Sequence, residues 1–267
     1  MSTQYKEEKM FSRLAVLLLL FTGLCSAEIV FNGGGVIPHL VDGSGWKTII
    51  TLVNLNDTSA TYKLSLNDDK GAALSLTTTL GTGSDFSGTL PPRGSTVIET
   101  AGLNAGLSQG WAYVSTPLTS IIGGTAVFRR VAPGQPNYEA SEPIDTGITN
   151  RFALPFDHIT DATGVALVNL LGSATISITF RDEGGITFLT DSFQVAQGGH
   201  VAYTFTTRYP QTVGRRGTFE ISSSSVWISV LGLRFSPSGA FSSVTPLVPI
   251  TWIVPTNAAY KATILSR

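Results

Sequence analysis

Two segments of the chain alternate polar and apolar side chains with a period of two. Residues Thr61–Leu66 read Thr-Tyr-Lys-Leu-Ser-Leu, and residues Thr175–Phe180 read Thr-Ile-Ser-Ile-Thr-Phe. Such alternation places one set of side chains on a buried strand face and the other toward water. Gly, Pro, Asn and Asp separate the short apolar stretches every ~8–12 residues, and no convincing helical spacing follows the first 27 residues. The pattern predicts an all-β chain of antiparallel β-sandwiches, immunoglobulin-like in shape.

The same order of strands and turns occurs twice along the chain. The corresponding segments are Thr51–Leu55 and Ala166–Leu170, Asn67–Gly71 and Arg181–Gly185, Leu90–Ser95 and Val195–His200, Gly110–Val114 and Gly217–Ile221, and Gly124–Phe128 and Leu231–Phe235. A period this long is typical of tandem domains rather than of a solenoid. We therefore predict β-sandwich domains at residues 28–146 and 147–249, followed by a C-terminal strand or tail at 250–267. Asn54 and Asn169 repeat with the strands, which predicts a role in the scaffold.

The first 27 residues have the order of features found in a signal peptide. Three basic residues precede an unbroken apolar run, Leu14–Phe21, and a small-residue site, Cys25–Ala27. Signal peptidase requires this order, and the run is shorter than the ~20 residues of a membrane-spanning helix. We predict a signal peptide at residues 1–27 and a mature chain that begins at Glu28. Lipidation of Cys25 and an uncleaved anchor are the alternatives.

Composition narrows the chemistry of the mature chain. The single Cys and both Met residues lie in the leader, so disulfides, thiolate nucleophiles and Cys-based metal sites are excluded after cleavage. The chain carries a net charge of −1 and the leader +1, which leaves −2 for the mature part. This balance offers no electrostatic basis for binding nucleic acid or anionic membrane, and no membrane span is predicted after the leader. We expect an extracellular, secreted bacterial protein, with the periplasm or cell surface as alternatives.

The cluster Asp157–Asp161 is the best local candidate for chemistry. A histidine flanked by carboxylates, here His158, can hold a metal ion or act as a general base. Comparison of the two copies aligns Asp157 with Asp42, in a loop before a strand. This favours a surface loop, and a hydrolase with a site near His158 remains an alternative.

The other two histidines have simpler interpretations. His200 aligns with Ser95 at a strand start, which predicts a turn or edge position, and His39 aligns with Phe156, which predicts a half-buried aromatic position. The serine in Gly81–Asp85 lacks the strand-turn-helix context of a hydrolase nucleophile. No catalytic residue is predicted.

Both copies contain a doubly acidic turn. The residues are Asp68 and Asp69 in the first copy and Asp182 and Glu183 in the second. Clustered carboxylates can begin a Ca²⁺ shell, but Asn, Asp and Gly are also the residues that tight turns need. We interpret these as turns, with weak Ca²⁺ binding as the alternative, and predict no other metal or cofactor.

The glycine-rich loop Asp42–Trp46 is the candidate ligand-binding site. Trp46 is the tryptophan most plausibly exposed, and it could stack on a sugar ring with Asp42 beside it. A Trp that caps the end of a core is the favoured structural interpretation. The partners predicted are an extracellular polysaccharide or a surface protein.

The first copy resembles a known module. The strings Pro38–Trp46 and Leu52–Leu55, with Gly124–Arg129 later, are similar to an uncharacterised tandem β-sandwich module that recurs in exported proteins of acidobacteria-like soil bacteria. The second copy departs from it, since Asp161–Gly164 lacks the glycine-rich Trp loop. The resemblance implies the fold and the compartment, and it transfers no catalytic residue.

These observations together predict a non-enzymatic secreted or cell-surface protein. Its β-sandwiches would serve as interaction or spacer modules, and a carbohydrate-binding accessory protein that uses loop aromatics is the alternative. The apolar segment Ile250–Val254 in the tail is predicted to form a strand, either with these domains or with another chain.

Overall fold

The computed structural model describes residues 33–248, except 132, 133, 135 and 226. The predicted signal peptide and the 250–267 tail lie outside the described residues. Within the described part, strands dominate, and the helical elements are α2 (Phe205–Arg208) and a 3₁₀ turn at Pro210–Thr212. The prediction of an all-β chain with antiparallel sheets is confirmed.

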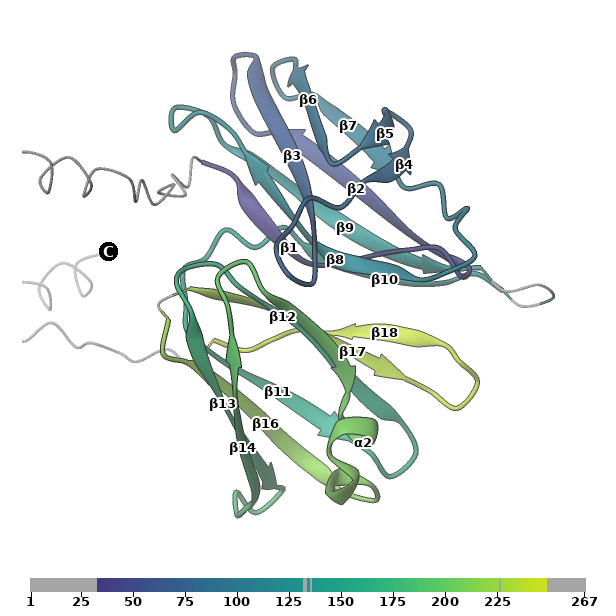
Figure 1. The fold of residues 1–267 in the computed structure, drawn as a ribbon, viewed down its shortest axis with the longest axis vertical. Helices are drawn as coiled ribbons and strands as arrows, with labels where there is room; N and C mark the ends of the chain where they lie inside the picture. Colours follow the sequence, from purple (N-terminus) through teal and green to yellow (C-terminus); the bar gives the residue numbers. More distant parts are fainter. Residues whose placement is uncertain (1–32, 132–133, 135, 226, 249–267) are drawn as a thin grey trace, which may run out of the picture. The chain divides into compact units, whose positions relative to one another are not determined.

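The strands of the described part fall into two groups along the chain (Figure 1). The first half contains β1 (Gly35–Asp42), β2 (Trp46–Asn54), β3 (Ala60–Asp68), β4 (Leu76–Thr78), β5 (Gly81–Gly83), β6 (Asp85–Leu90), β7 (Ser95–Glu99), β8 (Ser108–Ser115), β9 (Ile122–Arg130) and β10 (Tyr138–Pro143). The second half contains β11 (Arg151–Asp157), β12 (Ala162–Asn169), β13 (Ala174–Asp182), β14 (Thr187–Val195), β15 (His200–Thr204), β16 (Arg216–Ser223), β17 (Ile228–Phe235) and β18 (Phe241–Val244).

The two halves have the same strand order. The sheets of the first half run β1-β8-β3-β6 and β10-β9-β2-β7, and those of the second run β11-β16-β13-β14 and β18-β17-β12-β15. The small β4–β5 pair belongs to the first half alone in the described part. In the second half, one hydrophobic cluster draws side chains from both sheets, which is consistent with a β-sandwich.

The alternating segments and the acidic turns form as the sequence predicts. Tyr62, Leu64 and Leu66 on β3 are buried while Thr61 and Lys63 are exposed, and β13 repeats this pattern. In both turns the first Asp accepts a backbone hydrogen bond four residues on, and the closing Gly has a φ of +79°. A side chain is disfavoured at that φ, so glycine is needed there.

Asn54 and Asn169 hold equivalent turns, which confirms the predicted scaffold role. The Asn54 side-chain amide donates to the carbonyls of Thr58, Leu90 and Pro91. The Asn169 amide donates in the same way to three carbonyls, those of Gly172, Val195 and Ala196.

Strand register corrects two of the correspondences drawn between the copies. Asn54 pairs with Ile122 and Asn169 with Ile228, so Thr125 on β9 matches Leu231 on β17, one residue away from the alignment by sequence. The alignment by sequence matched residues of similar type here, whereas the strand pairing matches positions of equal register.

The second correction comes from a β-bulge in β1. Leu40 on β1 lies opposite Gly110, and Phe156 on β11 lies opposite Gly217, which is the residue that matches Gly110 in the second half. Phe156 therefore matches Leu40 and not His39. The register of β1 shifts between Ile37 and Leu40, where the extra residue is accommodated. The position of Asp42 is then matched by His158 rather than by Asp157. Bulges redirect side chains, and this one accommodates His39 without a counterpart in the second half.

Strands β12 and β17 are buried on both faces. One face contributes Val165, Leu167 and Val230 to the core of the second half. The other face places Ala166 and Leu231 in a cluster with the first-half core. In Figure 1, β12, β17 and β18 accordingly lie between the first half and the β11-β16-β13-β14 sheet. We call this contact between the halves the seam.

Candidate functional site at the seam

Three polar residues form a hydrogen-bonded chain across the seam. His200 Nδ1 lies 2.8 Å from Asp69 Oδ1, and His200 Nε2 lies 3.3 Å from His39 Nδ1. The carboxylate oxygen of Asp69 acts as the acceptor, so Nδ1 of His200 carries a proton and donates to it. The His200 side chain is fully buried and the backbone N–H of His200 also donates to Asp69 O. The predicted edge position of His200 is confirmed, since β15 lies at the edge of its sheet. The His200 side chain is nevertheless buried, because it lies in the seam.

Burial shifts the proton affinities in this chain. Desolvation, with the nearby His200 second, lowers the pKa of His39 to about 3. Partial burial acts to raise the pKa of Asp69, but hydrogen bonds from His200 and Gln109 outweigh it and hold that pKa below its usual value. His39 is half-buried as predicted, and its ring packs on Phe128 with centroids 5.6 Å apart. Burial thus favours the neutral form of His39, and hydrogen bonds favour the ionised form of Asp69, within a polar link between the halves.

Further hydrogen bonds connect the halves along the seam. Trp111 Nε1 donates to Gly198 O at 2.9 Å, and Ser229 Oγ donates to Asp145 Oδ2 at 2.5 Å. Ser243 Oγ donates to Ser141 O and accepts from Ser141 N at 3.1 Å. These last two serines occupy matching positions on β10 and β18, so the equivalent edge strands of the halves meet each other.

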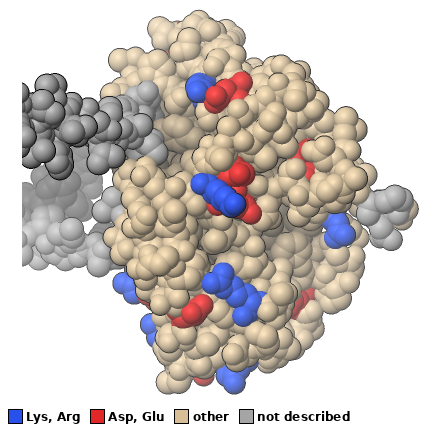
Figure 2. Space-filling view, in the orientation of Figure 1, with Lys and Arg blue, Asp and Glu red and all other residues tan. Residues whose placement is uncertain are grey.

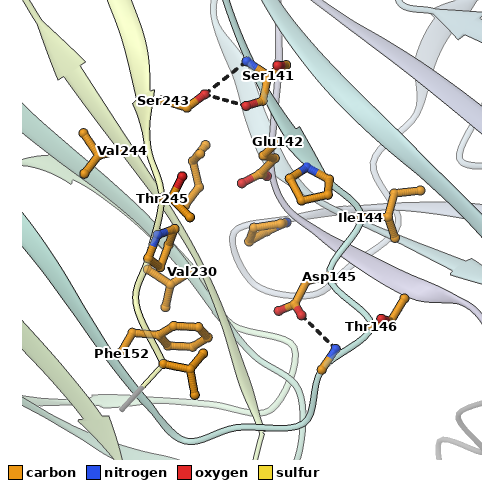
Figure 3. A pocket seen from close by; sticks show the side chains of 16 residues that line it. Ser141, Glu142, Ile144, Asp145, Thr146, Phe152, Val230, Ser243, Val244 and Thr245 are labelled. Carbon is orange, nitrogen blue, oxygen red and sulfur yellow. Dashed lines mark hydrogen bonds between the residues drawn. The ribbon is translucent and has the colours of Figure 1, made fainter. Parts of the chain in front are cut away.

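A cleft of about 430 Å³ opens at the seam between β10 and β18. Its walls are mostly apolar and include Pro38, Ile144, Phe152, Val230 and Val244. Figure 3 shows Glu142 and Asp145 on one wall and Phe152, Val230 and Val244 on the other. The cleft thus draws its lining from both halves.

Glu142 is the chemically unusual residue of the cleft. It is only 9% exposed, and its Oε1 has no hydrogen-bond partner among the described residues. Desolvation, reinforced by the charge of Asp145, raises the pKa of Glu142 well above its ordinary value. Sequence comparison missed this residue because the aligned segments stopped before β10. The feature of the sequence that could have identified Glu142 is a charged residue on β10 at the position where the matching strand, β18, carries Val244.

His158, the sequence candidate for catalysis, is occupied at both ring nitrogens. Nε2 accepts the backbone N–H of Thr163 at 3.1 Å, so Nδ1 carries the proton and donates to Thr212 Oγ1 at 2.9 Å. The residue is 4% exposed rather than a surface loop residue, and burial lowers its pKa. Asp157 and Asp161 instead form ion pairs with Arg216 and Arg234. The structure does not bring the cluster together around a shared centre.

The Asp42–Trp46 loop is a tight hairpin rather than an open binding loop. Asp42 is 2% exposed and accepts the Gly102 N–H at 2.7 Å. Trp46 packs on Phe241 of the second half with ring centroids 5.0 Å apart, and Arg130 lies over its indole. Its interpretation as a cap on the core is confirmed. A ligand role for either residue stays a prediction.

Three of the four carboxylates in the acidic turns form hydrogen bonds with other residues of the chain. Asp68 Oδ1 accepts backbone N–H groups of Lys70 and Ala72, and Asp69 bonds to His200 and Gln109. Asp182 accepts from Ile186, and Glu183 is exposed. No group of three or more His, Asp or Glu side chains in the described part is placed to hold a metal ion. Weak Ca²⁺ binding at these turns stays the untested alternative to their interpretation as turns.

The outer surface of the described part is polar and mixed in charge. No Trp, Tyr or Phe there is in an exposed position, and Trp111 and Trp227 are buried. Figure 2 shows scattered blue and red groups on one face rather than a broad area of one sign. Several aliphatic side chains are exposed in loops, such as Leu118 at 75% and Ile121 at 62%. Among the described residues, no helix is long and apolar enough to cross a membrane.

No protein-family model matches the chain, and no curated protein sequence matches it.

Proposed function

We propose that the chain is a non-enzymatic exported protein whose tandem β-sandwiches act as an interaction or spacer unit. The observation that carries the proposal is that the potentially reactive side chains form hydrogen bonds that support the fold. His158 and Asp42 each hold a buried backbone group, and His39, His200 and Asp69 hold the two halves together. These hydrogen bonds anchor buried backbone groups and the contact between the halves, which supports a structural use of these side chains.

The exposed loops supply the surface for such a role. Leu55, Leu118 and Ile121 are exposed at one end of the first half, where Leu55 N donates to Ile121 O. Loops at the ends of a sandwich are the usual binding elements of this architecture, because the scaffold fixes them while their sequence is free to vary.

Export is tested by producing the full chain, leader included, in a bacterial host. We expect the product outside the cytoplasm, with Glu28 as its first residue by N-terminal sequencing. A full-length product that stays in the cytoplasm contradicts the proposal.

The non-enzymatic part is tested with a panel of esterase, peptidase and glycosidase substrates. We expect no turnover above that of a mock preparation. Turnover that is lost in His158→Ala, while the variant remains folded by circular dichroism, would instead establish the hydrolase alternative.

The carbohydrate-binding alternative has less support, because its aromatic platform would have to be exposed. Trp46 is covered by Phe241 and Arg130. Quenching of tryptophan fluorescence by a soluble polysaccharide, abolished in Trp46→Ala, would favour this alternative over the spacer role.

A further inference from the structure

The cleft between β10 and β18 combines two carboxyl groups with a largely apolar lining. Its titratable lining consists of Glu142 and Asp145, and no Lys, Arg or His lines it among the described residues. The rest of the lining comes from both halves and is mostly aliphatic, aromatic and proline side chains, with the hydroxyl side chains of Ser141, Thr146, Ser243 and Thr245 among them. A site of this volume accommodates a small organic ligand.

The two carboxyl groups differ in how they are satisfied. Asp145 accepts from Ser229 Oγ at 2.5 Å through Oδ2 and from Gly147 N at 2.9 Å through Oδ1, so each of its carboxyl oxygens has a donor. Glu142 is nine-tenths buried, its Oε1 has no partner, and its side chain projects into the cleft (Figure 3). A buried carboxyl without a partner is costly unless a proton or a cation joins it.

We propose that this cleft binds a small organic cation, an ammonium group attached to an apolar body. The ammonium would replace the proton on Glu142, donate to its unpartnered Oε1 and be attracted by Asp145. The apolar body would lie against Phe152, Val230 and Val244. A neutral ligand could instead accept a hydrogen bond from protonated Glu142. Its lone pair would then lie near the carboxyl oxygens of Asp145, which disfavours it relative to the cation. This inference goes beyond the interaction role and does not depend on the compartment.

Three compounds with one skeleton test the charge preference on the full mature chain at neutral pH. Benzylamine is the cation, benzyl alcohol the neutral isostere and benzoate the anion, with binding measured by titration calorimetry. We expect benzylamine to bind at least about tenfold more tightly than benzyl alcohol, a difference of about 1.4 kcal/mol. Benzoate should not bind.

Variants place the effect in the cleft. Glu142→Gln keeps the shape and removes the carboxyl group, so it should strongly reduce the preference for benzylamine over benzyl alcohol, with Asp145 as the one carboxyl group left in the described lining. Glu139→Gln is the matched control, because Glu139 lies on the same strand in an exposed ion pair with Arg129 and should leave the preference unchanged. Val244→Phe fills the cleft from the opposite wall and should weaken both compounds. Thermal unfolding verifies that each variant is folded.

The proposal is overturned by any of three results. These are no saturable benzylamine binding at millimolar concentration, equal or tighter binding of benzyl alcohol, and an unchanged preference in Glu142→Gln.

Discussion

Positions that match in strand register carry different side chains in the two halves. Asp42 matches His158, and Glu142 matches Val244. All three polar side chains of these pairs are buried, and a buried polar group must be hydrogen-bonded or be costly. Asp42 and His158 find backbone partners, whereas Oε1 of Glu142 does not. The difference between the halves therefore gives structural anchors at one position and an unsatisfied group at the other.

His158→Ala should destabilise the protein because it leaves the buried Thr163 N–H without an acceptor. A buried donor that loses its partner costs roughly 1–3 kcal/mol, to which the lost ring packing adds. Asp57→Asn is the control, because Asp57 and its partner Arg93 are both exposed side chains and such pairs contribute about 0–1 kcal/mol. Urea unfolding monitored by circular dichroism gives both values. Equal effects of the two substitutions would contradict the anchoring role.

Glu142→Gln should gain stability relative to the wild type as the pH rises. The folded pKa of Glu142 lies above the unfolded value, so its contribution is fully present below about pH 4.5 and is lost above it. Above that pH the side chain ionises in the unfolded chain while it keeps its proton in the folded protein. The free energy of unfolding then falls by up to about 1.4 kcal/mol per pH unit. Glutamine does not titrate, so the variant escapes this loss. Unfolding free energies at pH 4.5, 6 and 7.5 should show a difference that grows with pH, and a constant difference would refute the assignment.

Strands of the same type are buried differently in the two halves. In β2, buried and half-buried positions alternate, whereas β12 is buried from Thr163 to Asn169. β17 is likewise buried from Ile228 to Leu233, because the first half covers its outer face. A continuous apolar run rather than an alternating one is the sequence signal of burial on both faces.

Leu231→Ala and Thr125→Ala form a matched pair for this difference. The two residues occupy the same register position on β17 and β9, but Leu231 is 1% exposed at the seam and Thr125 is exposed. Removing a buried Leu side chain costs about 2–5 kcal/mol, whereas an exposed substitution stays within about 0.5 kcal/mol. Denaturant unfolding of both variants tests this. A cost for Leu231→Ala no greater than that for Thr125→Ala would mean that the seam does not persist in solution.

Local patterns predicted the elements of this fold well, and long-range packing is what they missed. Alternation on β3 and β13, the acidic turns, and the roles of Asn54 and Asn169 each depend on residues close in sequence or repeated in it. The bulge that accommodates His39 depends on one extra residue in β1, which an ungapped alignment absorbs as a mismatch. The Glu142 cleft exists only where two halves meet, so no property of β10 alone indicates it.

The two halves share hydrophobic and polar contacts that should make them unfold together. Leu231, Leu233 and Phe241 of the second half belong to the hydrophobic cluster of the first. The Asp69–His200–His39 chain and the Trp111–Gly198 bond add polar contacts at the same seam. Interfaces between domains are often loose, but a large apolar contact couples their stability.

Asp69→Ala should separate the unfolding of the halves. The substitution leaves His200 Nδ1–H buried without its acceptor, which costs roughly 1–3 kcal/mol and falls on the seam rather than on either core. Glu183→Ala is the matched control, because Glu183 follows Asp182 as Asp69 follows Asp68, but it is exposed. Calorimetry should give one transition for the wild type and for Glu183→Ala. For Asp69→Ala it should give a broadened or split transition, with a calorimetric enthalpy above the van't Hoff value. A single sharp transition at the wild-type temperature in Asp69→Ala would show that the polar chain does not couple the halves, and that apolar burial by β12 and β17 is sufficient.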